Sequence, residues 1–97
     1  MEDRVWIAVV TFRMRASWVH SLKEKRMAVK SLIAKLQNRF HISVAETGAQ
    51  DVHQTILISA AAIVPNRAAA DSLLDEISRF AEENTDAEIL DEIREVR

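Results

Sequence analysis

The chain has 97 residues, the length of one domain, and 48% of them are hydrophobic. It has no cysteine, which excludes disulfides and thiolate metal sites. A single glycine and a single proline leave no composition for a flexible linker. Residues 1–97 are therefore predicted to form one domain.

The net charge of −2 conceals an uneven distribution of charged residues. Residues 1–48 contain nine Lys and Arg against four acids, whereas residues 49–97 contain four Arg against eleven acids. This segregation predicts a basic patch and an acidic patch on one molecule, although two solvated helix faces of opposite sign would give the same counts.

The opening residues Met1–Arg4 lack the basic stretch of a signal peptide, and no cleavage site of small residues follows. No apolar run reaches the length of a membrane span. Together with the absence of cysteine, these features lead us to expect a cytoplasmic protein with no membrane partner.

Residues 4–15 alternate between two sides, which is the period of a β-strand. Trp6 lies on one side, and Val5, Ile7 and Val9 lie on the other. Because both sides are apolar in the first half of this segment, we expect the strand to lie at the centre of a sheet.

A helix over residues 22–40 is predicted by aliphatic and aromatic side chains at helical spacing. Ser21 and Glu24 match a capping box, in which a serine precedes the first turn and a glutamate follows three residues later. Residues 41–47 alternate again and predict a second strand, and Gly48 marks the hairpin that follows.

Residues 54–64 are predicted to form a second long apolar strand, which Pro65 ends. Asn66 is a favourable N-cap for a second helix, and Asn84 is expected to end that helix.

Within this second helix, Asp75 and Arg79 have the i, i+4 spacing of an ion pair. Residues 87–96 predict a charged last strand at a sheet edge. The resulting order predicts the α+β class: a ferredoxin-like βαββαβ sandwich with a four-stranded antiparallel sheet, two helices on one face, and the other face open.

Two segments of the chain together resemble a known family. One is His20–Arg26, with the sequence HSLKEKR, and the other is Ser43–Asp51, with the sequence SVAETGAQD. They resemble the YlxP-like family of short bacterial proteins of unknown function, and the likeness extends over essentially the whole chain. The resemblance implies a ferredoxin-like fold and no established activity.

The genes of that family often lie among translation genes, which implies a connection with the ribosome or with RNA. Two positions depart from the family pattern. Trp18 stands where smaller or polar residues are usual, and His53 stands where a tryptophan commonly follows the pair Gln50-Asp51. A function that depends on these loops would therefore differ in this chain.

Several cations are predicted to lie near the N-terminus of the first helix, where free N–H groups favour anions. They are Arg13, Arg15, Lys23, Arg26 and Lys30. This arrangement predicts contact with phosphate or RNA. The alternative is that Ser21 and Glu24 satisfy the helix end and that the cations are solvated.

The same end of the sheet is expected to carry the rim of a site. Its residues are His20, Glu46, Gln50, Asp51 and His53. His41 is predicted at the opposite end, so three histidines cannot converge. A His20–His53 pair with Asp51 is the remaining alternative for a metal ion, but we expect surface histidines and no metal site. Glu46 is the most interesting acid, but pairing with a nearby cation explains it equally well. Without a phosphate-binding loop or a dinucleotide motif, we expect no cofactor and no catalysis.

The open sheet face is predicted to carry Val5, Ile7 and Val9, and such a patch suggests a homodimer. Base stacking of the kind seen in RNA-recognition motifs is disfavoured, because Trp6 and Phe12 point to the helix side and residues 54–64 contain no aromatic side chain.

Three functional hypotheses follow from the sequence. The first is a non-catalytic binding factor that contacts a ribosomal subunit or ribosomal RNA, and no DNA. The second is a homodimeric module that binds a protein or a small ligand. The third, an enzyme acting at the rim, is the weakest.

Overall fold

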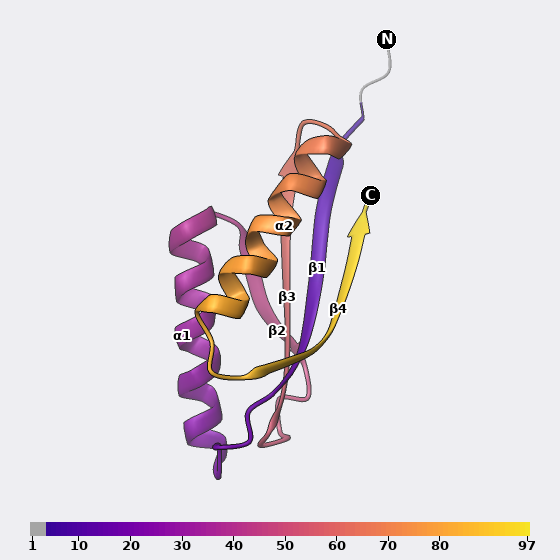
Figure 1. The fold of residues 1–97 in the computed structure, drawn as a ribbon. Helices are drawn as coiled ribbons and strands as arrows, with labels where there is room; N and C mark the ends of the chain where they lie inside the picture. Colours follow the sequence, from indigo (N-terminus) through magenta and orange to yellow (C-terminus); the bar gives the residue numbers. More distant parts are fainter. Residues whose placement is uncertain (1–3) are drawn as a thin grey trace.

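The computed structural model describes residues 4–97, so Met1, Glu2 and Asp3 of the N-terminal segment considered above lie outside it. The elements follow in the order β1 (Trp6–Arg15), α1 (Leu22–Phe40), β2 (Ser43–Gly48), β3 (Thr55–Val64), α2 (Arg67–Glu83) and β4 (Glu88–Val96). The strands form one antiparallel sheet in the order β2-β3-β1-β4 (Figure 1). The predicted ferredoxin-like βαββαβ fold is confirmed.

Strand β1 lies at the centre of the sheet, as its two apolar sides predicted. It pairs with β3 along its whole length, from Trp6 opposite Val64 to Arg15 opposite Thr55, and with β4 on its other side. Strands β2 and β4 are the two edges.

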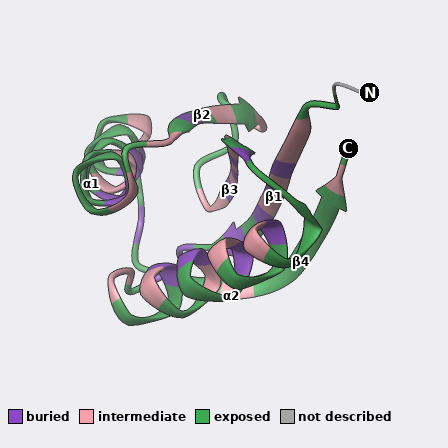
Figure 2. Cartoon of the chain, turned by 90° about the horizontal axis from the view of Figure 1, so that it is seen from above, coloured by how far each residue is buried: buried purple, intermediate pink, exposed green. Residues whose placement is uncertain are grey.

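The core lies between the sheet and the two helices. Val10, Phe12 and Met14 of β1 are buried, and they alternate with residues of the opposite face that are more exposed. Leu36 of α1 and Leu74 of α2 meet this layer, and burial of each such side chain contributes about 2 kcal/mol. Figure 2 shows that both helices lie on one side of the sheet.

Both helices begin where the sequence predicts. The Oγ atom of Ser21 accepts a hydrogen bond from the N–H of Glu24 at 3.1 Å, and the Oδ1 atom of Asn66 accepts one from the N–H of Ala69 at 2.8 Å. Asn84 ends α2, as predicted.

The second strand differs from its predicted range of 41–47, because it runs from Ser43 to Gly48. His41 takes a left-handed conformation with φ of 52° and caps α1, which delays the strand. Gly48 has no positive φ, and Ala49 has the φ of 53° instead. A Cβ atom at Gly48 would lie 2.8 Å from a terminal methyl group of Leu57, so a larger residue there would require the flexible Leu57 side chain to shift.

The predicted ion pair between Asp75 and Arg79 is wrong. Asp75 accepts a hydrogen bond from Arg94 of β4 at 2.7 Å, and Arg94 also contacts Glu92 at 3.1 Å. Tertiary contact with a neighbouring strand thus replaces the pairing within the helix, and the hydrogen bond to Asp75 raises the pKa of Arg94.

Within residues 4–97, neither helix combines the length and the apolar composition needed to cross a membrane.

Candidate functional site

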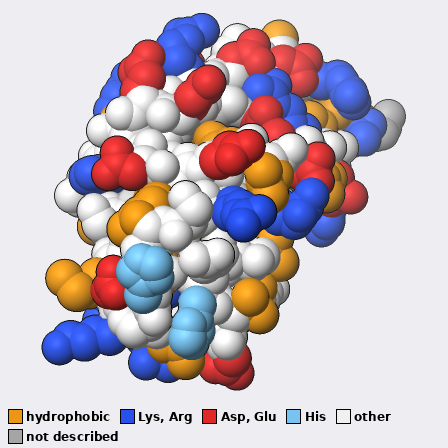
Figure 3. Space-filling model, turned by 60° about the horizontal axis from the view of Figure 1, so that its bottom comes forward, with side chains coloured by type: hydrophobic (Ala, Val, Ile, Leu, Met, Phe, Trp, Pro, Cys, Tyr) orange, Lys and Arg blue, Asp and Glu red, His pale blue; other side chains and the backbone are white. Residues whose placement is uncertain are grey.

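A cleft of about 620 Å³ lies at the C-terminal end of β1. We call it the arginine–histidine cleft after the two arginines and two histidines that line it: Arg13, Arg15, His20 and His53. Two histidine side chains lie close together on the face shown in Figure 3, with Lys and Arg side chains to either side. The structure therefore brings together two of the predicted phosphate contacts and two of the predicted rim residues.

Local structure explains why these four side chains meet. Arg13 and Arg15 occupy exposed positions on the open side of β1, His20 lies in the loop before α1, and His53 lies in the connection between β2 and β3. The Nε2 atom of Gln54 donates to the carbonyl oxygens of Ser17 at 3.1 Å and of Val19 at 3.2 Å, which fastens the two loops together.

The two arginines of the cleft differ in their electrostatic state. Arg13 donates to Asp91 of β4 at 2.6 Å, so its charge is partly neutralised. Arg15 makes no ion pair within residues 4–97. Donors from Arg15, His20, His53 and Thr55 face one space, which suits an anionic group such as phosphate.

The remaining predicted phosphate contacts lie elsewhere. Lys23, Arg26 and Lys30 are exposed on α1, and their spacing of three and four residues places them on one flank of the helix. None of them lines the arginine–histidine cleft. The predicted set is thus divided into a strand group and a helix group.

The position of the acid Glu46 within strand β2 is explained by its pairing with Lys25, a cation that the sequence analysis did not single out. The side chain of Lys25 is only 1% exposed, and its Nζ atom lies 3.2 Å from the Oε2 atom of Glu46. Lys25 also donates to the carbonyl oxygen of Ala49. The two segments that carry the family resemblance therefore meet in a buried ion pair, which ties α1 to β2, and the hydrogen bond to Ala49 ties α1 to the β2–β3 connection.

The other predicted rim residues do not join the cleft. Gln50 and Asp51 are exposed and do not line it. The described part of the chain contains no group of three His, Asp or Glu side chains placed to hold a metal ion.

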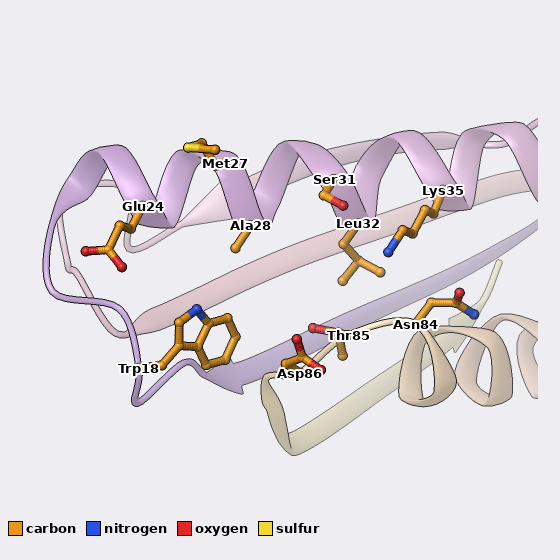
Figure 4. Close-up of a pocket in the computed structure, with 10 residues that line it drawn as sticks. All are labelled: Trp18, Glu24, Met27, Ala28, Ser31, Leu32, Lys35, Asn84, Thr85 and Asp86. Carbon is orange, nitrogen blue, oxygen red and sulfur yellow. The ribbon is translucent and has the colours of Figure 1, made fainter.

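A second cavity, of about 370 Å³, lies between α1 and the connection from α2 to β4 (Figure 4). We call it the Trp18 groove. The indole of Trp18 closes one end, and Ala28 and Leu32 of α1 form an apolar wall. Glu24, Lys35 and Asp86 supply its charged groups.

The open sheet face carries the predicted apolar residues and, in addition, the exposed side chains of Ile63 and Ile93. Val5 and Ile93 are each 63% exposed, and Ile63 is 79% exposed. Ile63 pairs with Ile7 across the sheet, and Ile93 pairs with Thr11.

A line of hydroxyl groups crosses the middle of this face. The Oγ atom of Ser59 lies 2.7 Å from the Oγ1 atom of Thr11 and 2.8 Å from that of Thr47. The line separates the apolar end, near Ile7 and Ile63, from the charged end that leads to the arginine–histidine cleft.

Sequence reasoning missed Lys25 and Gln54 as the residues that hold the site together. For Lys25 a signal was present, since it falls in the apolar stripe of α1, one turn before Val29. For Gln54 there was none, because its partners are backbone carbonyl groups 35 and 37 residues away.

Comparison with known proteins supports the family resemblance of the two segments. Residues 7–94 match the family model described as "Protein of unknown function (DUF503)". The chain is also 35% identical over 60 residues to the uncharacterized protein YlxP of Bacillus subtilis (strain 168), an alignment that covers 62% of this chain and 65% of that protein. Because the family model spans most of the chain, including all six helices and strands in whole or in large part, the protein belongs to the DUF503 family.

Proposed function

We propose that the protein is a non-catalytic RNA-binding factor that contacts the phosphate backbone of a ribosomal subunit. The observation that carries the proposal is a group of exposed cations on β1 and α1 that make no ion pair within residues 4–97. They are Arg15, Lys23, Arg26, Lys30, Lys35 and Arg39.

The distribution of charge supports an oriented encounter with a polyanion. Helix α1 carries six cations and one acid, whereas α2 carries two arginines and five acids and β4 carries one arginine and four acids. A polyanion is attracted to the side of α1 and repelled from the side of α2 and β4. Contacts with phosphate groups give affinity for nucleic acid that does not depend on its base sequence.

Binding is favoured over catalysis by the surroundings of Glu46, the acid that the sequence analysis singled out. Glu46 lies against Lys25 and is four-fifths buried, with an exposed fraction of 19%. Its carboxylate is committed to a structural ion pair and is poorly placed to exchange protons with a substrate. We choose the ribosome as the partner because the genes of the family that this chain resembles often lie among translation genes.

The test is co-sedimentation with purified ribosomal subunits over a series of salt concentrations. We expect the wild type to sediment with one subunit at low salt and to be released as salt rises, because phosphate contacts release counterions. The variant Lys23→Glu/Arg26→Glu should bind at least about tenfold more weakly, given the loss of two phosphate contacts and the addition of two repulsive charges.

The matched control is Arg67→Glu/Arg79→Glu, which changes the net charge by the same amount on exposed positions of α2. It should bind as the wild type does. If neither subunit carries the wild type at any salt concentration, or if both variants lose binding equally, the proposed contact through α1 is wrong. Circular dichroism establishes that both variants are folded.

A second function, homodimerisation through the open sheet face, is favoured by the exposure of Ile63 and Ile93. Ten-residue strands are about 33 Å long, and four strands span roughly 19 Å, so two such faces would bury on the order of 1,200 Å². That area reaches the lower limit of specific interfaces. We therefore propose a second copy of the chain as the partner of this face.

Analytical ultracentrifugation tests the dimer. Ile63→Glu should convert a dimer into a monomer, since the charge would be buried without a partner in the apolar end of the interface. Met27→Glu is the control, because Met27 is 65% exposed on α1 and lies away from the sheet face. A wild type that sediments as a monomer at all concentrations contradicts the proposal.

A further inference from the structure

The Trp18 groove lies on the other flank of α1 from Lys23, Arg26 and Lys30. Its volume of about 370 Å³ falls within the range of ligand-binding pockets, near the lower end. This is space for one long side chain and part of its backbone.

The aromatic end of the groove is open to a ligand. Trp18 is 41% exposed, although tryptophan is highly buried on average. Figure 4 shows its indole beneath the first turns of α1, with Glu24 on one side and Asp86 on the other.

In the described part of the chain, the two carboxylates near the indole are not neutralised by a paired cation, and Glu24 accepts only a long hydrogen bond, of 3.5 Å, from the Oγ atom of Ser21. Neither Glu24 nor Asp86 forms an ion pair within residues 4–97, and Glu24 is the only acid of a helix with six cations. Lys35 also lines the groove, 11 residues along α1 from Glu24, which is roughly 16 Å at 1.5 Å per residue.

We propose that the Trp18 groove binds the guanidinium group of an arginine side chain presented by another protein. A guanidinium group is planar, stacks on an indole face, and donates several hydrogen bonds to carboxylates at its edge. The exposed Trp18, with Glu24 and Asp86 beside it, offers both kinds of contact. The two carboxylates repel phosphate groups, which disfavours nucleic acid in the same space.

The far end of the groove restricts the segment that carries this arginine. Lys35 repels a second cation there, so the groove favours a single arginine with neutral or acidic neighbours over a run of basic residues. This site shares only Lys35 with the proposed RNA contact, and the residues proposed to hold the arginine, Trp18, Glu24 and Asp86, belong to the groove alone.

The probe is N-acetyl-arginine amide, and its comparison is N-acetyl-citrulline amide, which has nearly the same shape and no charge. In a spectrum that correlates amide protons with nitrogen, the indole N–H signal of Trp18 should shift and saturate with the arginine compound, while that of Trp6 stays in place. A Trp18→Phe variant assigns the two signals. The citrulline compound should bind at least tenfold more weakly.

Variants of the carboxylates complete the test. Glu24→Gln/Asp86→Asn should weaken binding of the arginine compound at least tenfold. Asp71→Asn/Glu82→Gln, which removes two exposed acids from α2, should leave it unchanged. Equal binding of arginine and citrulline overturns the proposal. So does a Trp18 signal that responds to a uridine oligonucleotide and not to arginine, which would make the groove a base-stacking site.

Discussion

Helices α1 and α2 occupy equivalent places in the two βαβ halves of the fold, yet they differ in charge and in what they bury. Helix α1 is strongly basic, and α2 is acidic. The buried side chains of α2 are all apolar, whereas α1 buries the charged Lys25 between apolar neighbours. Each helix must present an apolar stripe to the sheet. The charged residues on its outward face are not constrained by the fold and can take part in binding.

The largest expected effect concerns the buried charge that distinguishes α1. Glu46→Gln should lower the free energy of unfolding by about 3 kcal/mol, because Lys25 then remains buried without a counter-charge. Urea unfolding measures this change. The double variant Lys25→Met/Glu46→Leu should recover most of the loss, since a well-packed apolar pair replaces a buried ion pair at little cost.

Glu24→Gln serves as the control for that series, because Glu24 is exposed in the same helix and its change should stay within about 0.5 kcal/mol. A Glu46→Gln variant as stable as the control would show that the ion pair is not what joins α1 to β2.

The N-terminal ends of the two helices should behave alike. Ser21→Ala and Asn66→Ala each remove one side-chain acceptor from a first-turn N–H group, and each should lower the free energy of unfolding by about 1 kcal/mol. Thermal unfolding of the two variants measures both values. If only one of the two variants loses stability, the two N-caps do not contribute equally and the prediction is wrong.

The C-terminal ends should behave differently. His41 has a φ of 52°, so His41→Gly should raise the free energy of unfolding by roughly 0.5–1 kcal/mol through relief of the left-handed conformation. Asn84 has a φ of −118°, and its Nδ2 atom donates to the carbonyl oxygen of Phe80 at 2.9 Å. Asn84→Gly should therefore give no gain, and equal stabilisation in the two variants would contradict this account.

The smallest expected effect is that of the ion pairs between α2 and β4. Arg94→Gln removes contacts to Asp75 and Glu92 and should lower the free energy of unfolding by about 0.5 kcal/mol, since the arginine side chain is 36% exposed.

Salt, not pH, is the variable that tests this pair. The raised pKa of Arg94 means that its contribution is complete below its unfolded value and is lost only at still higher pH, far above the range in which the protein would be measured. The difference between the wild type and Arg94→Gln should thus be constant from about pH 5 to 9 and should shrink in 1 M salt. A difference that stays the same in 1 M salt would assign the effect to packing of the arginine stem.

The sequence by itself determined the order of the elements, the caps at Ser21 and Asn66 and the central place of β1, because periodicity and capping are local properties of the chain. It also determined the segregation of charge that underlies the proposed RNA contact.

Only the tertiary structure decided which charges meet. It paired Lys25 with Glu46 and Asp75 with Arg94. It also divided the predicted phosphate contacts between a cleft and a helix flank, and it placed Trp18 in one groove with Glu24 and Asp86. Each of these outcomes joins residues distant in sequence, or depends on which flank of a helix faces its neighbour. Such pairings follow from the packing of whole elements, and no local pattern in the chain encodes them.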